Sequence, residues 1–305
     1  MSSKQKITTN LWFDQEARQA AEFYCSLFPG SAISNITVLH DTPSGDADIV
    51  SFELDRQPFM AINGGPLFKF NPSTAFILNF DPSRDQNARE NLDRVWRELS
   101  KGGRALMPLQ EYDFSKRFGW VEDQFGLSWE LMLTDPEGEE RPFITPALLF
   151  TGDKAGRAEE AVNFYLSVFK NARMGSMHRY PKEMRLKNGG TVQFADLMIE
   201  NTWFAVMDSV NDQPFDFNEA ISLIVYCEDQ EAIDYYWKKL SAVPEAEQCG
   251  WLKDKFGVSW QIVPAAMDEM MGNGTREQVD RVTQAFLPMK KLVIADLEKA
   301  YKGES

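Results

Sequence analysis

The sequence offers one carboxylate in a place where it can do chemistry. Glu130 stands between Trp129 and Leu131 in a run of alternating residues that is typical of a β-strand. If Trp129 packs into a core, Glu130 points to the opposite side of the strand. There it is either a solvated or ion-paired side chain, or a cavity carboxylate with a raised pKa that can act as an acid or a base. Both alternatives remain open at this point.

Other residues that commonly catalyse reactions or bind metals are few. The chain has two histidines, His40 and His178, and three cysteines, which are too scattered for a zinc site or a disulfide framework. His40 precedes Asp41, but adjacent residues of a strand point to opposite faces, so we expect a surface histidine near a turn. The chain contains no glycine-rich string of the kind that cradles nucleotide phosphates.

Composition narrows the function further. The 305 residues include 32 Lys and Arg against 46 Asp and Glu, which gives a formal net charge of −14. This acidic balance argues against nucleic acid or an anionic membrane as a partner. Hydrophobic residues make up 43% of the chain, enough for packed cores, and the length predicts two domains. The polar N-terminus has no apolar signal segment, so we expect a cytoplasmic protein.

The chain contains an internal duplication. The string FGWVEDQFGLSW at 118–129 returns as CGWLKDKFGVSW at 249–260, and AEFYCSLF at 21–28 returns as VNFYLSVF at 162–169. A repeat of this size predicts two tandem domains rather than a solenoid. We place them at residues 1–136 and 142–266, separated by a polar linker that contains two prolines and a glycine.

Hydrophobic patterns predict the elements that position these residues. In the first copy we expect strands at 7–13, 33–39, 49–54, 58–62, 74–80, 106–109, 120–122 and 128–133, with helices at 17–28 and 86–100. This order, strand–helix–strand–strand–strand, occurs twice and predicts an α+β fold with two curved sheets. A helical tail follows at 274–303, where Thr275 and Gln278 have capping-box spacing and Pro288 predicts a break.

The repeated strings resemble a known family. FYxS(L/V)F after a short strand, and GW followed by DxFG(V/L)SW, are similar to the PhnB-like branch of the vicinal oxygen chelate superfamily, which also contains glyoxalases, bleomycin-resistance proteins and dioxygenases. Members of this branch carry the label 3-demethylubiquinone-9 3-methyltransferase. The resemblance covers both copies. It implies tandem glyoxalase-like domains, each built of paired βαβββ modules that form a cupped sheet.

The resemblance also implies where metal ligands would stand. The corresponding places fall at Thr9 or Asn10, near Ser73, and at Glu130 in the first copy, and at about Thr145, Ala220 and Gln261 in the second. Of these residues only Glu130 is of a type that coordinates metal ions strongly, and a transition-metal site needs several such ligands. We therefore expect no complete metal site and no cofactor. A divalent metal held through Glu130 is the alternative.

We predict a protein that binds a small hydrophobic or aromatic molecule in the cup. Glu130 is the candidate catalytic residue, and the candidate ligand-binding residues are Asn10, Trp12, Ser73 and Gln261. The alternative is an enzyme with lyase, dioxygenase or transferase chemistry that uses Glu130 as metal ligand or general base, so catalysis itself stays open. The expected partner is a small molecule, without nucleic acid or membrane. The expected assembly is a monomer whose domains pair within one chain, or a homodimer.

Overall fold

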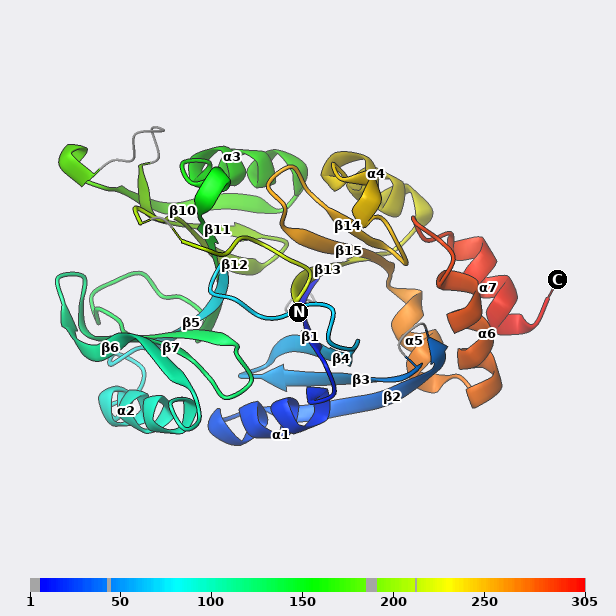
Figure 1. Cartoon of the computed structure of the whole chain (residues 1–305), viewed down its shortest axis with the longest axis horizontal. Coiled ribbons are helices and arrows are strands. Elements are labelled where there is room, and N and C mark those ends of the chain that lie inside the picture. Colours follow the sequence, from blue (N-terminus) through cyan, green and yellow to red (C-terminus); the bar gives the residue numbers. More distant parts are fainter. Residues whose placement is uncertain (1–5, 43–44, 185–190, 212, 305) are drawn as a thin grey trace. The chain divides into compact units, whose positions relative to one another are not determined.

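A computed structural model describes residues 6–42, 45–184, 191–211 and 213–304. Its helices and strands alternate in the predicted α+β order (Figure 1). The first repeat contains β1 (Ile7–Phe13), α1 (Ala17–Leu27), β2 (Ala32–Thr42), β3 (Gly45–Leu54), β4 (Gln57–Asn63), β5 (Thr74–Phe80), α2 (Ala88–Leu99), β6 (Arg104–Tyr112), β7 (Ser115–Glu122) and β8 (Ser128–Leu133). The stretch that is longer in the first repeat, at about 101–118, forms most of the β6–β7 hairpin.

The second repeat follows the same order. It contains β9 (Ile144–Phe150), α3 (Ala158–Val168), β10 (Ala172–Arg179), β11 (Val192–Ile199), β12 (Thr202–Asp208), β13 (Ile221–Cys227), α4 (Gln230–Leu240), β14 (Trp251–Lys253) and β15 (Ser259–Pro264). Short 3-10 turns lie at Gly152–Lys154, Lys182–Met184 and Pro244–Ala246. The tail forms α5 (Ala266–Asn273), α6 (Arg276–Phe286) and α7 (Ile294–Lys302).

The two repeats exchange halves when they form sheets. One sheet has the strand order β14-β15-β13-β1-β4-β3-β2, and the other has the order β10-β11-β12-β9-β5-β8-β7-β6. The compact units follow the sheets: unit 1 comprises 1–69 and 218–305, and unit 2 comprises 70–217. Each unit therefore joins one βαβββ module of the first repeat to one of the second. The repeats at 1–136 and 142–266 and the compact units divide the chain differently.

Helices cover one face of each sheet. In unit 1, α1 packs on β1–β4 and α4 on β13–β15, and in unit 2, α2 packs on β5, β7 and β8 and α3 on β10–β12. The helix α2 shows why: Leu92, Val95 and Leu99 recur at three or four residues and are buried. Asp229 caps α4, where its carboxylate accepts from the Ala232 amide at 2.8 Å. We call the opposite face of each sheet its inner face.

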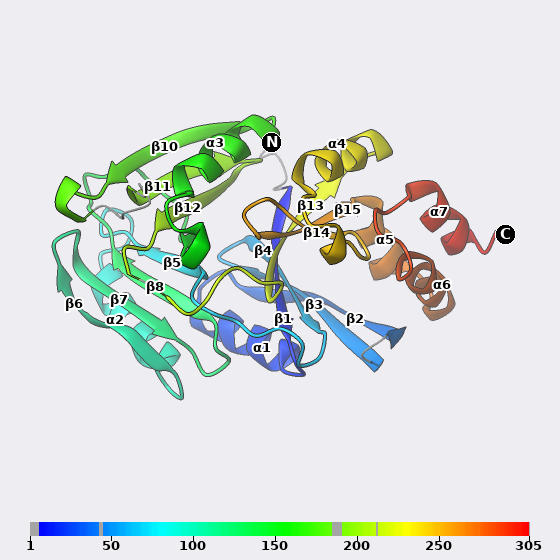
Figure 2. The same ribbon diagram turned by 45° about the horizontal axis from the view of Figure 1, so that its top comes forward.

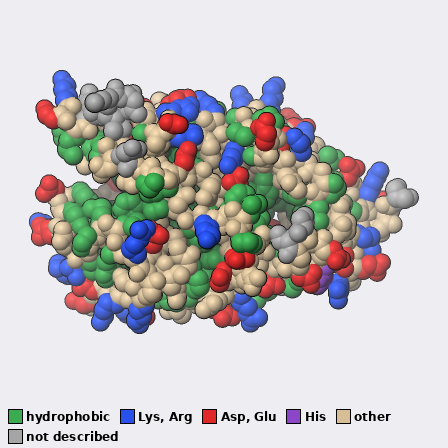
Figure 3. Space-filling view, viewed as in Figure 1, with side chains coloured by type: hydrophobic (Ala, Val, Ile, Leu, Met, Phe, Trp, Pro, Cys, Tyr) green, Lys and Arg blue, Asp and Glu red, His purple; other side chains and the backbone are tan. Residues whose placement is uncertain are grey.

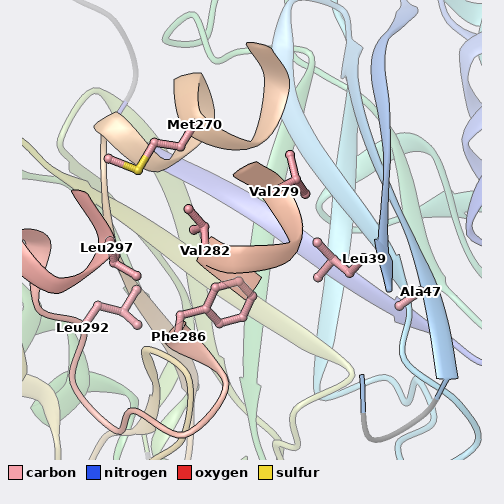
Figure 4. Close-up of a cluster of buried hydrophobic side chains, with 8 residues drawn as sticks. All are labelled: Leu39, Ala47, Met270, Val279, Val282, Phe286, Leu292 and Leu297. Carbon is pink, nitrogen blue, oxygen red and sulfur yellow. The ribbon is translucent and has the colours of Figure 1, made fainter. Parts of the chain in front are cut away.

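The tail packs on the sheet of unit 1. Both bonds of the predicted capping box between Thr275 and Gln278 are present, and α6 ends before Pro288, which confirms both predictions. The tail and strands β2 and β3 share one apolar cluster (Figure 4), whose buried members are Leu39, Ala47, Met270, Val279, Val282, Phe286, Leu292 and Leu297. Burial of these side chains stabilises the tail against the sheet.

The surface in view carries charges of both signs. Figure 3 shows acidic and basic side chains intermixed over the one face that it draws. Within the described ranges, no helix is both long and apolar enough to cross a bilayer.

Candidate functional site on the inner face of unit 2

Glu130 lies on the inner face of unit 2. Its neighbour Trp129 is fully buried on the helix-covered side, with its ring 5.3 Å from the ring of Phe76, so the alternation of β8 turns Glu130 the other way. In the strand register, Glu130 stands between Ile77 of β5 and Trp120 of β7. These direct cross-strand neighbours share its face of the sheet.

The rest of this inner face is mainly apolar. Across β5, Ile77 stands opposite Thr145 of β9. An apolar cluster continues over the neighbouring strands and consists of Ala75, Ile77, Ala147 and Ala205, with Met132, Phe194 and Met207 packed against them. Glu130 is therefore an acid at the edge of a surface made largely of alanine, isoleucine and methionine.

The Glu130 side chain is largely buried, and its carboxyl has no polar partner among the described residues. The residue is 9% exposed, and among the described residues nothing donates a hydrogen bond to it or forms an ion pair with it. Because burial penalises the charged form, the pKa of Glu130 is raised to about 7. A pKa near 7 is the property that a carboxyl needs to act as an acid or a base near neutral pH, and that role for Glu130 stays a prediction.

The residues around Glu130 do not fit a metal ion of the superfamily type. Its register neighbours Ile77 and Trp120, and Thr145 on the far side of Ile77, include no imidazole, thiolate or second carboxylate. In the part of the chain that the structure describes, no three His, Cys, Asp or Glu side chains come together as a metal-binding group. A Zn, Ni or Fe centre needs several such ligands in one shell.

Unit 1 carries an amide at the equivalent place. Gln261 of β15 donates to the Ser222 hydroxyl at 2.9 Å, and Asn10 of β1 donates to the same oxygen at 3.3 Å. We call Asn10, Ser222 and Gln261 the amide triad. The predicted residues Asn10 and Gln261 thus meet through Ser222, which the sequence analysis missed by placing the corresponding position at Ala220. The alternation of Ile221–Cys227 was the signal that could have identified Ser222.

The other two predicted ligand-binding residues, Trp12 and Ser73, do not lie beside Glu130. Trp12 is held by the loop after β4: its indole nitrogen donates to the Gly65 carbonyl at 2.8 Å, and its ring makes edge contacts with Phe68 and Trp251. Ser73 is buried just before β5 and belongs to unit 2, four residues before Ile77. The five predicted site residues are therefore divided between the units, with Asn10, Trp12 and Gln261 in one and Ser73 and Glu130 in the other.

The repeated DxFGxSW string builds a turn rather than a site. In unit 2, Asp123 accepts from the amides of Phe125 and Leu127 and from the Trp129 indole at 2.9 Å. In unit 1, Asp254 makes the same three contacts, including 2.9 Å to the Trp260 indole. The aspartate thus fixes the tryptophan of the last strand on the helix-covered side. That in turn places Glu130 or Gln261 on the inner face.

Paired βαβββ modules and a helix-covered, curved sheet define the glyoxalase-like class of the vicinal oxygen chelate superfamily. Maize glyoxalase I has this fold: it aligns with 84% of this chain and 91% of its own at 12% identity, with a TM-score of 0.51. A likeness at this level of identity shows the fold alone.

The family is shown by sequence. The profile of the 3-demethylubiquinone-9 3-methyltransferase family matches residues 5–132 and 142–263, so the chain belongs to this family, in two tandem copies. The PhnB protein of Bacillus cereus is 36% identical over 43% of this chain and 100% of its own, with a TM-score of 0.38. Protein PA1353 of Pseudomonas aeruginosa is 21% identical over 41% and 94%, with a TM-score of 0.35. No curated protein matches the chain. The predicted family and fold class are confirmed.

Proposed function

We propose that the chain binds a small, uncharged hydrophobic or aromatic molecule on the inner face of unit 2, with Glu130 as its main polar contact. The observation that carries the proposal is the largely buried Glu130 side chain, whose carboxyl has no hydrogen-bond or ion-pair partner among the described residues. Buried polar groups normally have hydrogen-bond partners, and those that lack one call for an explanation such as a ligand. The apolar surface of Ala75, Ala147 and Ala205 supports a hydrophobic ligand body.

A carboxyl with a pKa near 7 can contact either of two ligand groups. When protonated it donates to a carbonyl, and when ionised it accepts from a hydroxyl. Phenols and quinones offer these groups on a flat apolar ring. The family name refers to 3-demethylubiquinone, a quinone of this chemistry, which supports the same ligand class for this chain.

The test is a calorimetric titration with 2-naphthol, a neutral hydroxylated aromatic probe, at pH 8. We expect wild-type protein to bind it and Glu130→Gln to bind about tenfold more weakly, since one hydrogen bond to a charged group is lost. The matched control is Glu137→Gln, the same exchange at an exposed position, which should leave this affinity unchanged. Equal affinities for wild type and Glu130→Gln, or no binding, would contradict the proposal.

An enzyme is the second candidate, and the same carboxyl favours it. A general acid or base works best with a pKa near the working pH, and the pKa of Glu130 is about 7. Metal-assisted chemistry is tested separately by elemental analysis of untagged protein. A stoichiometric transition metal that is lost in Glu130→Ala would support a metal enzyme in spite of the poor donor set. No metal in either protein would leave general acid–base chemistry as the enzymatic route.

A further inference from the structure

The helix α2 and the hairpin of β6 and β7 enclose a hollow in unit 2. Its volume is about 700 Å³, and its lining includes Glu90, Asp93, Trp96, Arg97, Pro108 and Leu109. Figures 1 and 2 both show α2 beside this hairpin. Arg117 of β7 also lines the hollow, and it stands an odd number of positions from Trp120, so the hollow and Glu130 lie on opposite faces of the sheet. The hollow is therefore separate from the site on the inner face.

The internal duplication identifies the equivalent place in unit 1. The string DRVWRELS at 93–100 returns as DYYWKKLS at 234–241, so Asp93 of α2 is equivalent to Asp234 of α4. In unit 1 the tail is bound there, because Lys291 forms an ion pair with Asp234 at 2.6 Å. Both helices thus present an aspartate at this place, and in unit 1 a lysine of the tail meets it.

Further bonds hold the tail along α4. The Gln230 side chain donates to the Leu292 carbonyl at 3.2 Å and accepts from the Ile294 amide at 2.9 Å. Residues 291–293 belong to no helix or strand, and Val293 has extended backbone angles. The segment along α4 is therefore a short nonhelical stretch in which a lysine is followed by a leucine.

The hairpin replaces only part of this segment in unit 2. In unit 1 the Cys249 and Gly250 amides donate to carbonyls of the tail at 2.6 and 2.7 Å. Their equivalents at 118–119 belong to β7, which pairs with β6 instead. The place of residues 291–293 is not replaced, because the hollow opens beside Asp93, where unit 1 has the lysine.

The lining of the hollow offers an aromatic wall and an exposed acid. A carbon atom added at Gly119 would lie 2.5 Å from the Trp96 ring, so the ring packs against the backbone of β7. Asp93 is already paired with Arg117 at 2.8 Å. Glu90 is exposed and forms no ion pair within the described ranges. A cation that enters the hollow therefore has Glu90 as its main partner.

The charges of α2 repeat those of α4. Glu90 and Arg97 are equivalent to Glu231 and Lys238, and the unit 1 groove with these charges takes a lysine. The net charge of −14 also favours the approach of a basic segment.

We propose that the hollow is a docking site for an extended segment of another protein, in which a lysine is followed by an apolar residue. The lysine pairs with Glu90 and the apolar side chain contacts Trp96. This chemistry is that of Lys291 and Leu292, which lie at the equivalent place in unit 1. The proposal does not depend on ligand binding at Glu130.

Fluorescence anisotropy with a labelled peptide LPMKKLVI, residues 287–294 of the tail, tests the site. We expect saturable binding to the intact chain. Glu90→Gln should weaken it about threefold, since an exposed ion pair is lost, and Ala105→Trp, which fills the hollow from β6, at least about tenfold. Glu137→Gln and Ala32→Trp, the same exchanges at exposed positions elsewhere, should leave the affinity unchanged. No binding, or equal affinities for all five proteins, would overturn the proposal.

Arg117→Gln should strengthen binding. It introduces the residue type that unit 1 has at Gln248, and it frees Asp93 for the lysine of the peptide. We expect about threefold tighter binding, and at least about tenfold weaker binding of a peptide that carries Lys291→Glu. Unchanged affinity in both cases would overturn the proposal.

Photo-cross-linking locates the bound peptide. A benzophenone at its N-terminus should label residues 88–117, whereas labelling of 230–253 would show that the peptide displaces the tail in unit 1 and would overturn the site. Analytical ultracentrifugation tests a second copy of the chain as the occupant. A dimer that Ala105→Trp dissociates would assign the hollow to the tail of that copy and overturn a separate partner. Glu130→Gln should bind the peptide like wild type, so these results are distinguishable from those for the inner face.

Discussion

Glu130 on β8 and Gln261 on β15 stand at the same place in the two repeats, but within the described ranges only Gln261 has a polar side-chain partner. Gln261 donates to Ser222 at 2.9 Å, whereas the Ser222 position of unit 2 is taken by Ala75. Unit 2 thus has alanine in place of the serine and glutamate in place of the glutamine. These two differences replace the hydrogen-bonded amide of unit 1 by an acid that has no polar partner among the described residues. The two inner faces are built alike and offer different chemistry.

The raised pKa of Glu130 makes stability depend on pH. The folded-state pKa is about 7, against about 4.3 in an unfolded chain, so the folded protein binds more protons between these values. With respect to this group, stability is therefore highest below about pH 4, and by pH 7 it has fallen by roughly 3 kcal/mol. Glu130→Gln should remove this fall and be the more stable protein at pH 8.

Urea unfolding at pH 5, 6, 7 and 8 measures the effect. The control is Glu137→Gln, at an exposed linker position, which should keep the pH dependence of wild type. A wild-type protein and a Glu130→Gln variant with parallel pH profiles would show that the carboxyl is solvated or paired after all.

The amide triad should depend on its serine. Ser222→Ala removes the only described acceptor of the Asn10 and Gln261 amides, and unpaired buried donors cost about 1–3 kcal/mol. We expect this loss in the free energy of unfolding. Ser167→Ala, which removes an exposed hydroxyl bonded to the Phe164 carbonyl, should change it by less than about 0.5 kcal/mol. Equal stabilities of the two variants would argue against the triad.

The aspartate of the repeated string should be structural in both units. Asp254→Ala and Asp123→Ala each leave a buried indole and two turn amides without their acceptor, so each should cost about 3 kcal/mol. Asp153→Ala, at an exposed position, is the control. Thermal melts followed by calorimetry give the shift. A loss of ligand binding with unchanged melting would instead point to a functional role for these aspartates.

Trp12 should be sensitive to the loop that holds it. A methyl group added at Gly64 would overlap the Trp12 ring, so Gly64→Ala should destabilise unit 1 by roughly 2 kcal/mol. The same substitution should cost much less in a Trp12→Leu background, because the smaller side chain frees the space. A double-mutant cycle of urea midpoints measures this coupling. Additive effects would show that the ring and the loop do not constrain each other.

Much of the fold was open to prediction because its signals are local. The repeat, the strands around Trp129 and the Thr275–Gln278 capping box follow from the order and spacing of residues. The pairing of β1 with β13 is different. It joins residues more than 200 positions apart, such as Asn10 and Ser222, and depends on which sheet edge each module offers. No local sequence pattern indicates which modules pair. The sequence therefore allows the pairing of modules from different repeats but does not predict it.

For the candidate site, too, the sequence predicts the local features and leaves the cross-strand neighbours open. Alternation placed Glu130 opposite Trp129, which the structure supports. Whether the carboxyl is paired depends on cross-strand neighbours, here Ile77 and Trp120, which the register determines and the sequence does not. Ser73 is predicted as a ligand-binding residue because it corresponds to a ligand position implied by the resemblance, but Ile77 is the residue of β5 that stands beside Glu130. The role of Ser73 remains a prediction.

The most direct test of the account is the protonation of Glu130 itself. A carbon-13 NMR titration of the glutamate side-chain carboxyls, with Glu130→Gln to assign the signal, reports its pKa without reference to stability or ligand. The account predicts a midpoint near 7 for the free protein and a shift of that midpoint when 2-naphthol is added. A midpoint at or below about 4.5, the range of an ordinary solvated glutamate, would contradict it.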